Sequence, residues 1–500
     1  MAERYLLGLD VGTQGSKGLL TTPEGRIVAQ HYVEHTVLHP QPGWAEHDAD
    51  RHWWQDVVEI VRTLLSASGV APASIQAIGI SGLFPDMLPA DEQGRPLRPA
   101  LLYSDNRAAA QIERINSQLG CQLTSEEITP KLLWFMEEEP ELFARARMVF
   151  SGSSYLAYRL TGQYSTDCIT AAFFGALYDP ATDRWRPDVC AQLGIPLDLL
   201  PPIYPPAHIL GGVSETAAAE TGLAAGTPVL TSACDVYFSL LGAGVFRQGD
   251  VMIYYGTAGL TTLCLCDLEL AARAPCHTES GSPFRYLAYM LTSGELVRWF
   301  RDEFGQPEVA EAARTGERAY ALLDRLAEQV PPGAQGLVCL PYFQGQRSPE
   351  FNPQARGVFY GWSMAHTRGH MLRAILESYG YGILHSLEVG VPGWRDSIRR
   401  VVASGGGAAS PLWRQIVSDI VGVRQEYVAG AEASLGAAYL AGYAVGLVPD
   451  FEGLCRGWVE VNGVTEPDAT RHRAYRPYYE LYRDLHDDLR ARQRGAAGSS

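Results

Sequence analysis

The N-terminal segment of the chain alternates short apolar runs with turn residues. In YLLGLDVGTQGSKGLLTTPEGRIVAQHYVEH, a Gly-rich turn and a PEGR turn separate three stretches of strand-forming residues. Turns of this composition join consecutive antiparallel strands, so the segment predicts a three-stranded meander. A helix is expected next, from about Asp48 to Ser66, with Asp48 or Asp50 as N-cap and with Trp53 and Ile60 on its apolar side.

A second copy of this pattern begins near residue 226. GTPVLTSACD reads as a buried strand ending in an acid, VYFSLLGAG as a helix of small residues, and GDVMIYYGTAGLTTLCL as strand, turn and strand. Two copies of one supersecondary design predict two related α/β domains. We place the boundary near Gly244–Gly249, which gives an N-terminal domain at 1–245, a C-terminal domain at 246–486 and a tail at 487–500.

The remaining elements extend these two domains. IQAIGISG is expected to form a buried strand and ITPKLLWFMEE a helix of the first domain. In the second domain, VAEAARTGERAYALLDRLAEQV predicts one charged helix ended by Pro331 and Pro332, and residues 367–389 predict a long one. The strand, Gly loop and helix of VVASGGGAASPLWRQIVSDIVG and the small-residue helix ASLGAAYLAGYAVG complete that domain.

Composition and charge limit the possible partners. Of 500 residues, 46% are hydrophobic and 19% are charged, which is enough apolar material for two cores. The formal net charge of −16 disfavours nucleic acid and anionic membranes as partners. No run approaches the apolar length that spans a bilayer, and the charged start MAER precedes an apolar run too short for a signal peptide. We therefore expect a cytoplasmic location.

The nine cysteines show no metal-binding or redox spacing. The closest two, Cys264 and Cys266, lie in the apolar run TTLCLC, where successive residues of a strand face opposite sides. An odd number of scattered cysteines predicts reduced, buried thiols. The final GSS has the composition of a cloning remnant.

The first candidate for chemistry is the loop in LLGLDVGTQGSKG. An apolar strand ends in Asp10, and Gly12 and Gly15 let the backbone turn tightly and expose N–H groups that can hold phosphate oxygens. Thr13 and Lys17 add a hydroxyl and a positive charge, and Asp10 could hold Mg²⁺ or its waters. A strand follows this loop where the P-loop and the Rossmann fingerprint need a helix, so both are disfavoured. An ordinary hairpin with a Gly turn explains the motif equally well.

Two more Gly loops occur in the second half of the chain. Tyr254–Gly259 lies between two expected strands, and Gly405–Gly407 leads from a strand to a helix that opens at Ser410-Pro411. Three successive glycines exceed what a tight turn needs, and they let an adenine or a phosphate approach the backbone closely. The alternatives are a hairpin turn for the first loop and a strand-to-helix turn for the second.

Asp235 ends the apolar run VLTSAC and begins a helix. It is therefore either an N-cap or a catalytic carboxylate. Phosphoryl transfer needs an aligned hydroxyl, a base for its proton and positive charge on the phosphates. An Asp at a strand end, opposite a Gly loop, meets the second of these needs.

Taken together, these motifs resemble those of the FGGY family of carbohydrate kinases. The family's order and approximate spacing are kept by LGLDVGTQGSKG, ITPKLLWF, TPVLTSACD, MIYYGTAG, LPYFQGQRSPEFNPQARGVFYG and ASGGGAASPLWRQIVSDIVG. The resemblance runs from about residue 4 to residue 486, is strongest over 340–445, and is closest to xylulokinase-like members. It implies two actin-like (ribonuclease H-like) α/β domains with a cleft between them, and ATP-dependent phosphorylation of a hydroxyl of a small sugar or polyol. Homodimers are frequent in the family, and no feature of this sequence decides the oligomeric state.

The resemblance also implies roles for single residues. Asp235 would be the catalytic base, and Asp10 would organise Mg²⁺ beside ATP. Closure of the domains over both ligands would exclude water and prevent hydrolysis. The expected nucleotide-binding residues are Gly12, Thr13, Gln14, Lys17, Gly256, Thr257, Gly294, Gly405, Gly406 and Ser410. The expected sugar-binding residues are Phe84, Asp86, Tyr103, Asp105 and Asp235.

Departures from the family pattern fall at the sugar side. Where xylulokinases carry Gln-Met-His after the strand IGISG, this chain has Leu83, Phe84 and Pro85, with Asp86 next, and Val236 replaces their Asn after the catalytic Asp. A site that bonds hydroxyl groups discriminates by its polar contacts, so these changes should change the sugar. We expect that D-xylulose is not the preferred substrate, that Asp86 bonds two neighbouring hydroxyls and that Phe84 packs on the carbon skeleton. A turn cap is the alternative for Asp86.

A second segment, LLYSDNRA, runs near the sugar in the family. Asp105 is the expected contact, and a surface ion pair with Arg107 is the alternative. Gln346 stands where the family often has Glu, and the change has no chemical interpretation here.

Two other functions fit a fold of this kind. An actin-like ATPase would use water in place of the sugar, but the chain has the LPYFQGQRSP segment and lacks a separate peptide-binding domain. A non-catalytic sugar sensor would have no chemical need for Asp10, Thr13 and Asp235. An Asp235→Asn variant distinguishes a kinase from the sensor, because only a kinase loses turnover while keeping its sugar binding.

Overall fold

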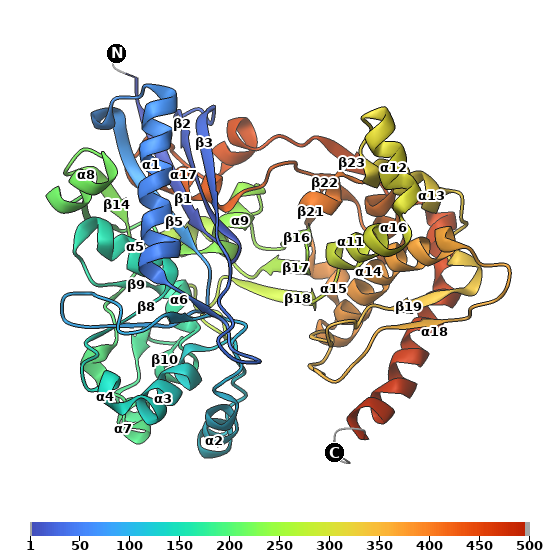
Figure 1. Ribbon diagram of the computed structural model, residues 1–500, viewed down its shortest axis with the longest axis horizontal. Coiled ribbons are helices and arrows are strands. Elements are labelled where there is room, and N and C mark those ends of the chain that lie inside the picture. The colour runs from blue at the N-terminus through green and yellow to red at the C-terminus, as the bar shows by residue number, and fades with distance from the viewer. Residues whose placement is uncertain (1–2, 496–500) are drawn as a thin grey trace. The chain divides into compact units, whose positions relative to one another are not determined.

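The chain forms two compact units, and the computed structural model describes residues 3–495, with side chains to residue 490 (Figure 1). The final GSS lies outside the described residues. Unit 1 comprises Met1–Phe246, Leu265–Pro283 and Glu432–Val459. Unit 2 comprises Arg247–Cys264, Phe284–Ala431 and Glu460–Ser500. Each unit is therefore assembled from segments that are distant in sequence.

Unit 1 is built around a seven-stranded sheet with the order β13-β14-β5-β1-β2-β3, in which β15 also pairs with β5. The strands are β1 Tyr5–Val11, β2 Gly15–Thr21, β3 Ile27–Glu34, β5 Ile75–Gly82, β13 Ile209–Gly212, β14 Pro228–Leu230 and β15 Ala233–Cys234. Strands β1, β2 and β3 form an antiparallel meander, and β5 runs parallel to β1, β14 and β15. The opening meander and the buried strand IQAIGISG are thus confirmed.

Helices cover both faces of this sheet. Helix α1 (Gln55–Ser68) packs on β2 and β3, and α17 (Ala433–Ala444) packs on β1 and β5. A side chain at Gly8 of β1 would meet α17, whereas Gly18 of β2, which pairs with Leu9, faces α1. Since neighbouring strand residues point to opposite faces, the two helices lie on opposite sides of the sheet.

The other helices and short strands of unit 1 surround this centre. The helices are α2 Ala109–Leu119, α3 Ile128–Glu138, α4 Pro140–Phe143, α5 Gly152–Thr161, α6 Cys168–Ala172, α7 Pro187–Leu193, α8 Glu215–Thr221, α9 Asp235–Gly242 and α10 Leu268–Arg273. The short strands are β4 Glu46–His47, β6 Leu88–Ala90, β7 Ala100–Leu101, β8 Met148–Phe150, β9 Thr166–Asp167, β10 Tyr178–Asp179, β11 Arg184–Trp185 and β12 Ile203–Tyr204. A π-helical turn, Ala49–Trp54, precedes α1, and its N-cap is Asp48, as predicted.

Unit 2 contains a six-stranded sheet with the order β18-β17-β16-β21-β22-β23. The strands are β16 Asp250–Tyr255, β17 Gly259–Cys264, β18 Phe284–Met290, β21 Arg400–Ser404, β22 Gln425–Tyr427 and β23 Gly463–Thr465. Strands β16 to β18 form an antiparallel meander and β16 runs parallel to β21, which repeats the arrangement of β1 to β3 and β5. The structure therefore confirms the repeated design predicted from the sequence.

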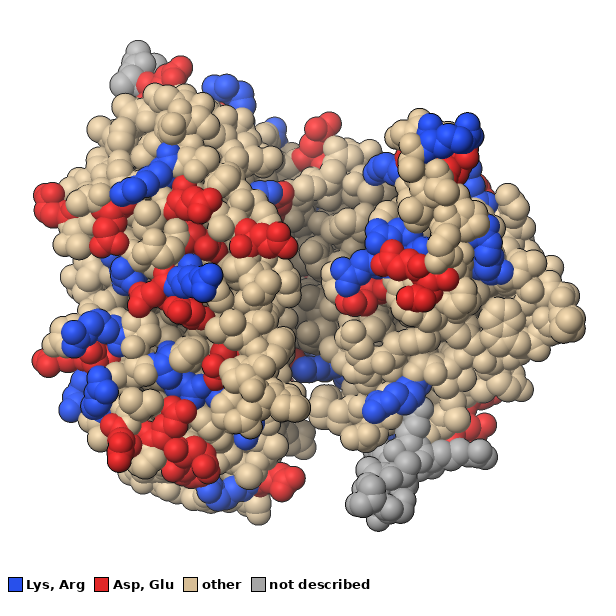
Figure 2. All heavy atoms as spheres, viewed as in Figure 1, with Lys and Arg blue, Asp and Glu red and all other residues tan. Residues whose placement is uncertain are grey.

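Helices of unit 2 flank this second sheet. They are α11 Gly294–Phe304, α12 Gln306–Thr315, α13 Ala319–Glu328, α14 Arg368–Gly390, α15 Trp394–Ser397, α16 Pro411–Val421 and α18 Ala469–Gly495, and a separate pair of strands is β19 Val338–Leu340 with β20 Val358–Tyr360. Helix α14 confirms the predicted long helix. On the face shown in Figure 2, acidic and basic side chains are interspersed over both units. Among the described helices, none has the length and apolar character needed to cross a membrane.

Helix α17 lies in unit 1, although the sequence pattern assigned it to the second domain. A Cβ atom at Gly8 would lie 1.9 Å from the carbonyl oxygen of Ser434, and one at Gly79 would lie 2.1 Å from that of Ala437. Strand and helix backbones can approach this closely only where the strand has glycine and the helix has small residues. The small residues of this helix therefore serve its packing against β1 and β5.

Three local expectations are wrong. The charged segment 309–330 forms two helices, because Gly316 ends α12 with a φ of 76°. The run VLTSAC is interrupted at Ser232, whose φ is 73°, so β14 and β15 are separate. Residues 487–495 continue α18 and do not form a tail.

The expectation of reduced, buried thiols holds for Cys168, Cys190, Cys234, Cys264 and Cys339, and it fails for the other four cysteines. Cys266 and Cys276 form a disulfide within unit 1 across a separation of ten residues, a spacing that carries no recognisable motif. Of the free cysteines, Cys455 is exposed and Cys121 is half-buried.

Candidate active site

Three neighbouring strands of unit 1 end side by side, and two acids lie at their ends. Ser81 of β5 pairs with Asp10 of β1 on one side and with Ala233 of β15 on the other. Because these strands are parallel, their carboxyl ends share one edge of the sheet, where ligands of open α/β sheets bind. Asp235 follows β15 directly and is the first residue of α9. The sheet thus brings Asp10 and Asp235 to the same edge.

Both acids have raised pKa values. Both are partly exposed. Burial, and then repulsion by Asp10, raises the pKa of Asp235 to about 8. Burial also raises the pKa of Asp10 to about 6, although the Ser81 hydroxyl, which donates to its Oδ1 at 2.5 Å, acts against this. Carboxyl groups in this state gain from a proton or a cation, which is typical of catalytic and metal-binding acids.

The first Gly loop joins β1 to β2 at this same edge. The Gly12 amide donates to the carbonyl of Gly15 at 3.0 Å, which closes the loop. Thr13 is half-buried and Gln14 is exposed. Lys17 lies opposite Asp10 across β1 and β2, and its ammonium group forms an ion pair with Glu432 of the same unit. The positive charge of Lys17 is therefore shared with a carboxylate.

The segment after β5 places Phe84 and Asp86 in the interior. Phe84 is 7% exposed and packs edge-on against Phe173, with ring centroids 4.6 Å apart. Asp86 is completely buried, and neither of its carboxylate oxygens has a hydrogen-bond partner among the described residues. Burial holds its pKa well above the ordinary value; its own backbone amide, Lys131 and the Gly152 amide act against this, and Asp235 adds to it. A buried carboxylate without partners is unfavourable unless something supplies donors to it.

Sequence reasoning missed Lys131, which lies in α3 within the ITPKLLWF motif. Its side chain is buried, and its Nζ donates to the carbonyls of Ser125 at 2.6 Å, Glu127 at 3.3 Å and Pro85 at 3.4 Å. Burial lowers the pKa of Lys131 to about 8. The bond to Pro85 fixes the segment that carries Asp86. A lysine inside an otherwise apolar helical pattern was the available signal.

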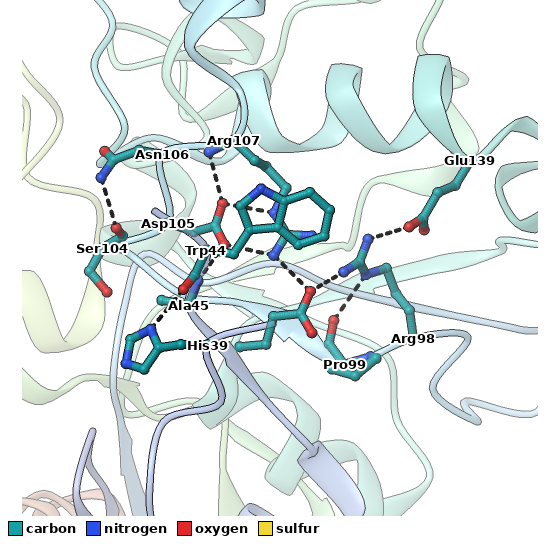
Figure 3. A network of polar contacts seen from close by, with 11 residues as sticks. His39, Trp44, Ala45, Arg98, Pro99, Ser104, Asp105, Asn106, Arg107 and Glu139 are labelled. Atoms are coloured by element: carbon teal, nitrogen blue, oxygen red, sulfur yellow. Dashed lines mark hydrogen bonds and ion pairs between the residues drawn. The ribbon is translucent and has the colours of Figure 1, made fainter. Parts of the chain in front are cut away.

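Asp105 lies in a buried network of polar contacts (Figure 3). Its Oδ2 accepts from the Ala45 amide and from Arg107, each at 2.7 Å, and its Oδ1 accepts from Nε of Arg107 at 2.8 Å. Arg107 also donates to Glu46 and lies 3.6 Å from the ring centroid of Trp44. The carboxylate is thus fully engaged, and its pair with Arg107 is buried and not at the surface. We therefore give Asp105 a structural role and omit it from the sugar contacts. Tyr103 is half-buried.

Unit 2 contains a cavity of about 610 Å³, a volume suited to a nucleotide. Its lining includes five of the predicted nucleotide-binding residues, namely Gly256, Thr257, Gly294, Gly406 and Ser410. Gly405, which directly precedes Gly406, has a φ of 91°, and a Cβ atom there would lie 2.9 Å from the backbone of Tyr255. Residues from three separate segments of the chain therefore line one cavity.

A backbone contact explains why residue 294 is glycine. The Gly294 amide donates to the carbonyl of Gly256 at 2.8 Å, and the Glu295 amide donates to that of Thr257 at 3.1 Å. A Cβ atom at Gly294 would lie 2.6 Å from the Gly256 oxygen, closer than real Cβ contacts allow. The N-terminus of α11 is thus tied to the turn between β16 and β17.

The rest of the cavity wall comes mainly from helices α13, α14 and α16. Leu376, Tyr320 and Trp413 supply apolar surface, and Arg318 and Asp324 supply charge. Burial raises the pKa of Asp324, and the Ser410 hydroxyl lowers it. Amphipathic periodicity predicted the helices, but it could not show which of their residues line a cavity.

A magnesium ion is compatible with the acids at the strand ends. Within the described part of the chain, no group of three or more His, Cys, Asp or Glu residues could hold a metal. Mg²⁺ keeps several waters and takes substrate phosphate oxygens, so one or two carboxylates are sufficient. Asp10 fits this need, because burial raises its pKa and the carboxylate gains from a nearby cation.

Comparison with known proteins covers nearly the whole chain. Residues 5–242 match the N-terminal domain, and residues 253–445 the C-terminal domain, of the FGGY family of carbohydrate kinases. The xylulose kinase of Escherichia coli (strain K12) is 30% identical, with 97% of this chain and 99% of the relative aligned. The gluconokinase of Bacillus licheniformis is 28% identical, with 95% and 94% aligned. The crystal structure of xylulose kinase from Rhodospirillum rubrum superposes with a TM-score of 0.85 at 29% identity, covering 98% of this chain and 100% of that one.

Proposed function

Because the chain belongs to the FGGY family of carbohydrate kinases, we propose that it transfers the terminal phosphoryl group of ATP to a hydroxyl of a small neutral sugar or polyol. The observation that carries this proposal is the position of Asp235. It lies at the carboxyl end of β15, beside Asp10, and its pKa of about 8 suits a group that accepts a proton near neutral pH. The expected kinase family and two-domain α/β fold are in agreement with the comparisons.

In the proposed mechanism, Asp235 accepts the proton of the attacking hydroxyl. The hydroxyl oxygen forms a bond to the γ-phosphorus, the bond from that phosphorus to the bridging oxygen breaks, and ADP leaves with the bond's electron pair. The amides of Thr13 and Gln14 would bind the transferred phosphoryl group, and the cavity of unit 2 would hold the nucleotide. Asp10 would hold Mg²⁺, which would supply positive charge to the phosphates.

The sugar side of the proposal rests on Asp86. Its unpaired oxygens are ready acceptors, and we infer that they bond two neighbouring hydroxyls while Phe84 packs on the carbon skeleton. Since the charge of Asp235 raises the pKa of Asp86, a substrate carboxylate near both acids would be repelled. The known relatives include both a xylulose kinase and a gluconokinase. We infer that this chain acts on neither D-xylulose nor gluconate as its preferred substrate.

A coupled ADP-release assay tests this proposal, with Mg²⁺-ATP and a panel of ketoses, aldoses, polyols and sugar acids. We expect a neutral compound to give the highest kcat/KM, with D-xylulose lower and sugar acids lowest. D-xylulose as the best substrate would contradict the role given to Asp86. Slow ATP hydrolysis without any acceptor would favour an actin-like ATPase and contradict the kinase itself.

A further inference from the structure

Three histidine rings form a cluster next to the first Gly loop. His35 follows β3, His47 ends β4, and His52 lies on the π-helical turn before α1. Their ring centroids are 4.8, 5.2 and 5.4 Å apart. All three are buried. The proposed reaction gives none of them a role, so the cluster needs a separate explanation.

His35 contacts the Gly loop through both its backbone and its side chain. Its amide donates to the carbonyl of Gln14 at 3.1 Å, and its Nε2 lies 3.0 Å from the carbonyl oxygen of Gly12. Its Nδ1 lies 2.7 Å from Oδ2 of Asp56 on α1, and the Ser16 hydroxyl donates to that same oxygen at 2.8 Å. A buried side chain therefore links α1 to the turn between β1 and β2.

The partners of the two ring nitrogens determine where the proton must be. The Gly12 carbonyl can only accept, so Nε2 of His35 must donate to it. Nδ1 then either donates to an ionised Asp56 or accepts from a protonated one. Both arrangements need one proton shared by the His35–Asp56 pair. If the pair loses that proton, Nδ1–H remains bonded to Asp56 and the lone pair of Nε2 faces the carbonyl oxygen, which breaks the contact with the loop.

The other titratable groups around His35 do not supply the proton that the His35–Asp56 pair shares. Burial, and then repulsion by His35, lowers the pKa of His47 to about 3, although the backbone of Thr13 acts against it. Burial and His35 also lower the pKa of His52. Tyr32 of β3 donates to the Gln14 carbonyl at 2.9 Å, and burial, Glu34 and Asp56 hold its pKa above the ordinary value. Near neutral pH these three neighbours are therefore uncharged.

Holding the Gly12 carbonyl fixes the direction of an amide. The peptide unit is planar and trans, so the N–H of Thr13 points opposite to the carbonyl of Gly12. With that carbonyl turned toward His35, the Thr13 amide is turned away from the histidine cluster. A phosphate oxygen bound by this amide is then held by a donor that needs no rearrangement.

We propose that His35, paired with Asp56, is a positioning residue that aims the Thr13 amide at the terminal phosphate of ATP. This inference rests on the proposed function of the Gly12–Gln14 loop. His35 does not touch the nucleotide, so its effect should be confined to the phosphoryl group that ADP lacks. The proposal predicts that loss of His35 lowers kcat/KM for ATP and leaves the binding of ADP and of sugar intact.

The test compares His35→Ala, His35→Gln and Asp56→Asn with the wild-type protein. We expect His35→Ala to lower kcat/KM for ATP by about 10- to 100-fold, the loss expected when a positioning contact is removed. The KM for the sugar and the Kd for ADP should stay within about twofold, since RT ln 2 is well below the free energy of one hydrogen bond. His35→Gln should recover much of the loss, because its amide can still donate to Gly12. The control is His31→Ala on β3, whose ring is 3.5 Å from Glu59 at the surface and should not matter.

Asp56→Asn gives a second readout. Its kcat/KM for ATP should stay near the wild-type value, because a neutral His35 can accept from the Asn amide and still donate to Gly12.

Equal values of kcat/KM for ATP in His35→Ala and wild type would overturn the inference and leave the kinase proposal intact. A parallel loss of sugar affinity would also overturn it, because the role would then be structural. If the wild-type protein phosphorylates no acceptor, the proposed function fails, and the inference fails with it.

Discussion

Replacing Asp86 by Asn removes a charge and keeps the shape of the side chain. In the free protein this carboxylate is completely buried and has no hydrogen-bond partner among the described residues. Leaving a buried acceptor unsatisfied costs about 1–3 kcal/mol, and more when it is charged. An unpaired amide is less unfavourable than an unpaired carboxylate. We therefore expect Asp86→Asn to raise the free energy of unfolding at pH 7 by about 1–3 kcal/mol.

The gain should depend on pH in a defined direction. Burial raises the pKa of Asp86 in the folded protein above its unfolded value. The stability linked to this group is fully present below the unfolded pKa and is lost as the pH rises through the folded pKa. The Asp86→Asn variant does not lose this stability. Its free energy of unfolding should therefore exceed that of the wild-type protein by a margin that grows as the pH increases. Urea unfolding at several pH values measures the difference.

The same variant should bind sugar poorly. Hydrogen bonds to a charged group contribute about 1.5–3 kcal/mol, which corresponds to about 10- to 150-fold in kcat/KM for the sugar. The KM for ATP should not change. Asp167→Asn is a matched control, because this buried acid accepts from the amides of Ile169 at 3.0 Å and Thr170 at 2.9 Å. Since Asn caps a helix nearly as well as Asp, the stability of the control should change by less than about 0.5 kcal/mol.

The opposite pair of results would refute this reasoning. A Cβ atom at Gly152, the first residue of α5, would lie 3.5 Å from Oδ2 of Asp86. The competing explanation is that the carboxylate has a purely structural role and stabilises the N-terminus of α5. In that case Asp86→Asn would lower the free energy of unfolding, and kcat/KM for the sugar would stay at the wild-type value.

Three further changes test other parts of the account. Gly79→Ala should destabilise the protein by about 1–3 kcal/mol, because its Cβ atom would lie 2.1 Å from a backbone oxygen of α17. The control is Gly211→Ala, whose Cβ atom would have its nearest neighbours 3.6 Å away and which should have little effect on the urea midpoint. Gly294→Ala should raise the KM for ATP about tenfold with the KM for sugar unchanged, because its Cβ atom would lie 2.6 Å from the Gly256 carbonyl; equal shifts in both constants would point to general disruption. In a pH–rate profile, kcat should rise as the pH approaches about 8, because the raised pKa of Asp235 leaves the base protonated below that value, and a flat profile between pH 6 and 8 would speak against it.

Local sequence patterns predicted the elements that carry the candidate site. Strand and turn signals located β1 and β2, and Asp10 at the end of β1 followed from them. Three successive glycines predicted the loop after β21, and Gly406 lines the cavity. These features depend on neighbouring residues, so a single sequence was sufficient to find them.

Features that depend on distant residues could not be predicted. The small residues of α17 indicate close packing, but only the fold shows that the partners are Gly8 and Gly79. The fold also determines that Cys266 and Cys276 form a disulfide. It likewise brings the Ala45 amide, which is distant in sequence, to the carboxylate of Asp105, which also accepts from Arg107. The cluster around His35 is another case, because its rings come from three separate elements.

The most direct test of the central claim is the turnover of Asp235→Asn with Mg²⁺-ATP and the best neutral acceptor of the panel. The variant keeps the side-chain shape but cannot accept the hydroxyl proton. General-base catalysis contributes about 10²- to 10⁴-fold, so the account predicts a fall in kcat of that size with sugar affinity within a few-fold of the wild-type protein. A kcat equal to that of the wild-type protein would contradict the role of Asp235 as the base, and with it the proposed mechanism.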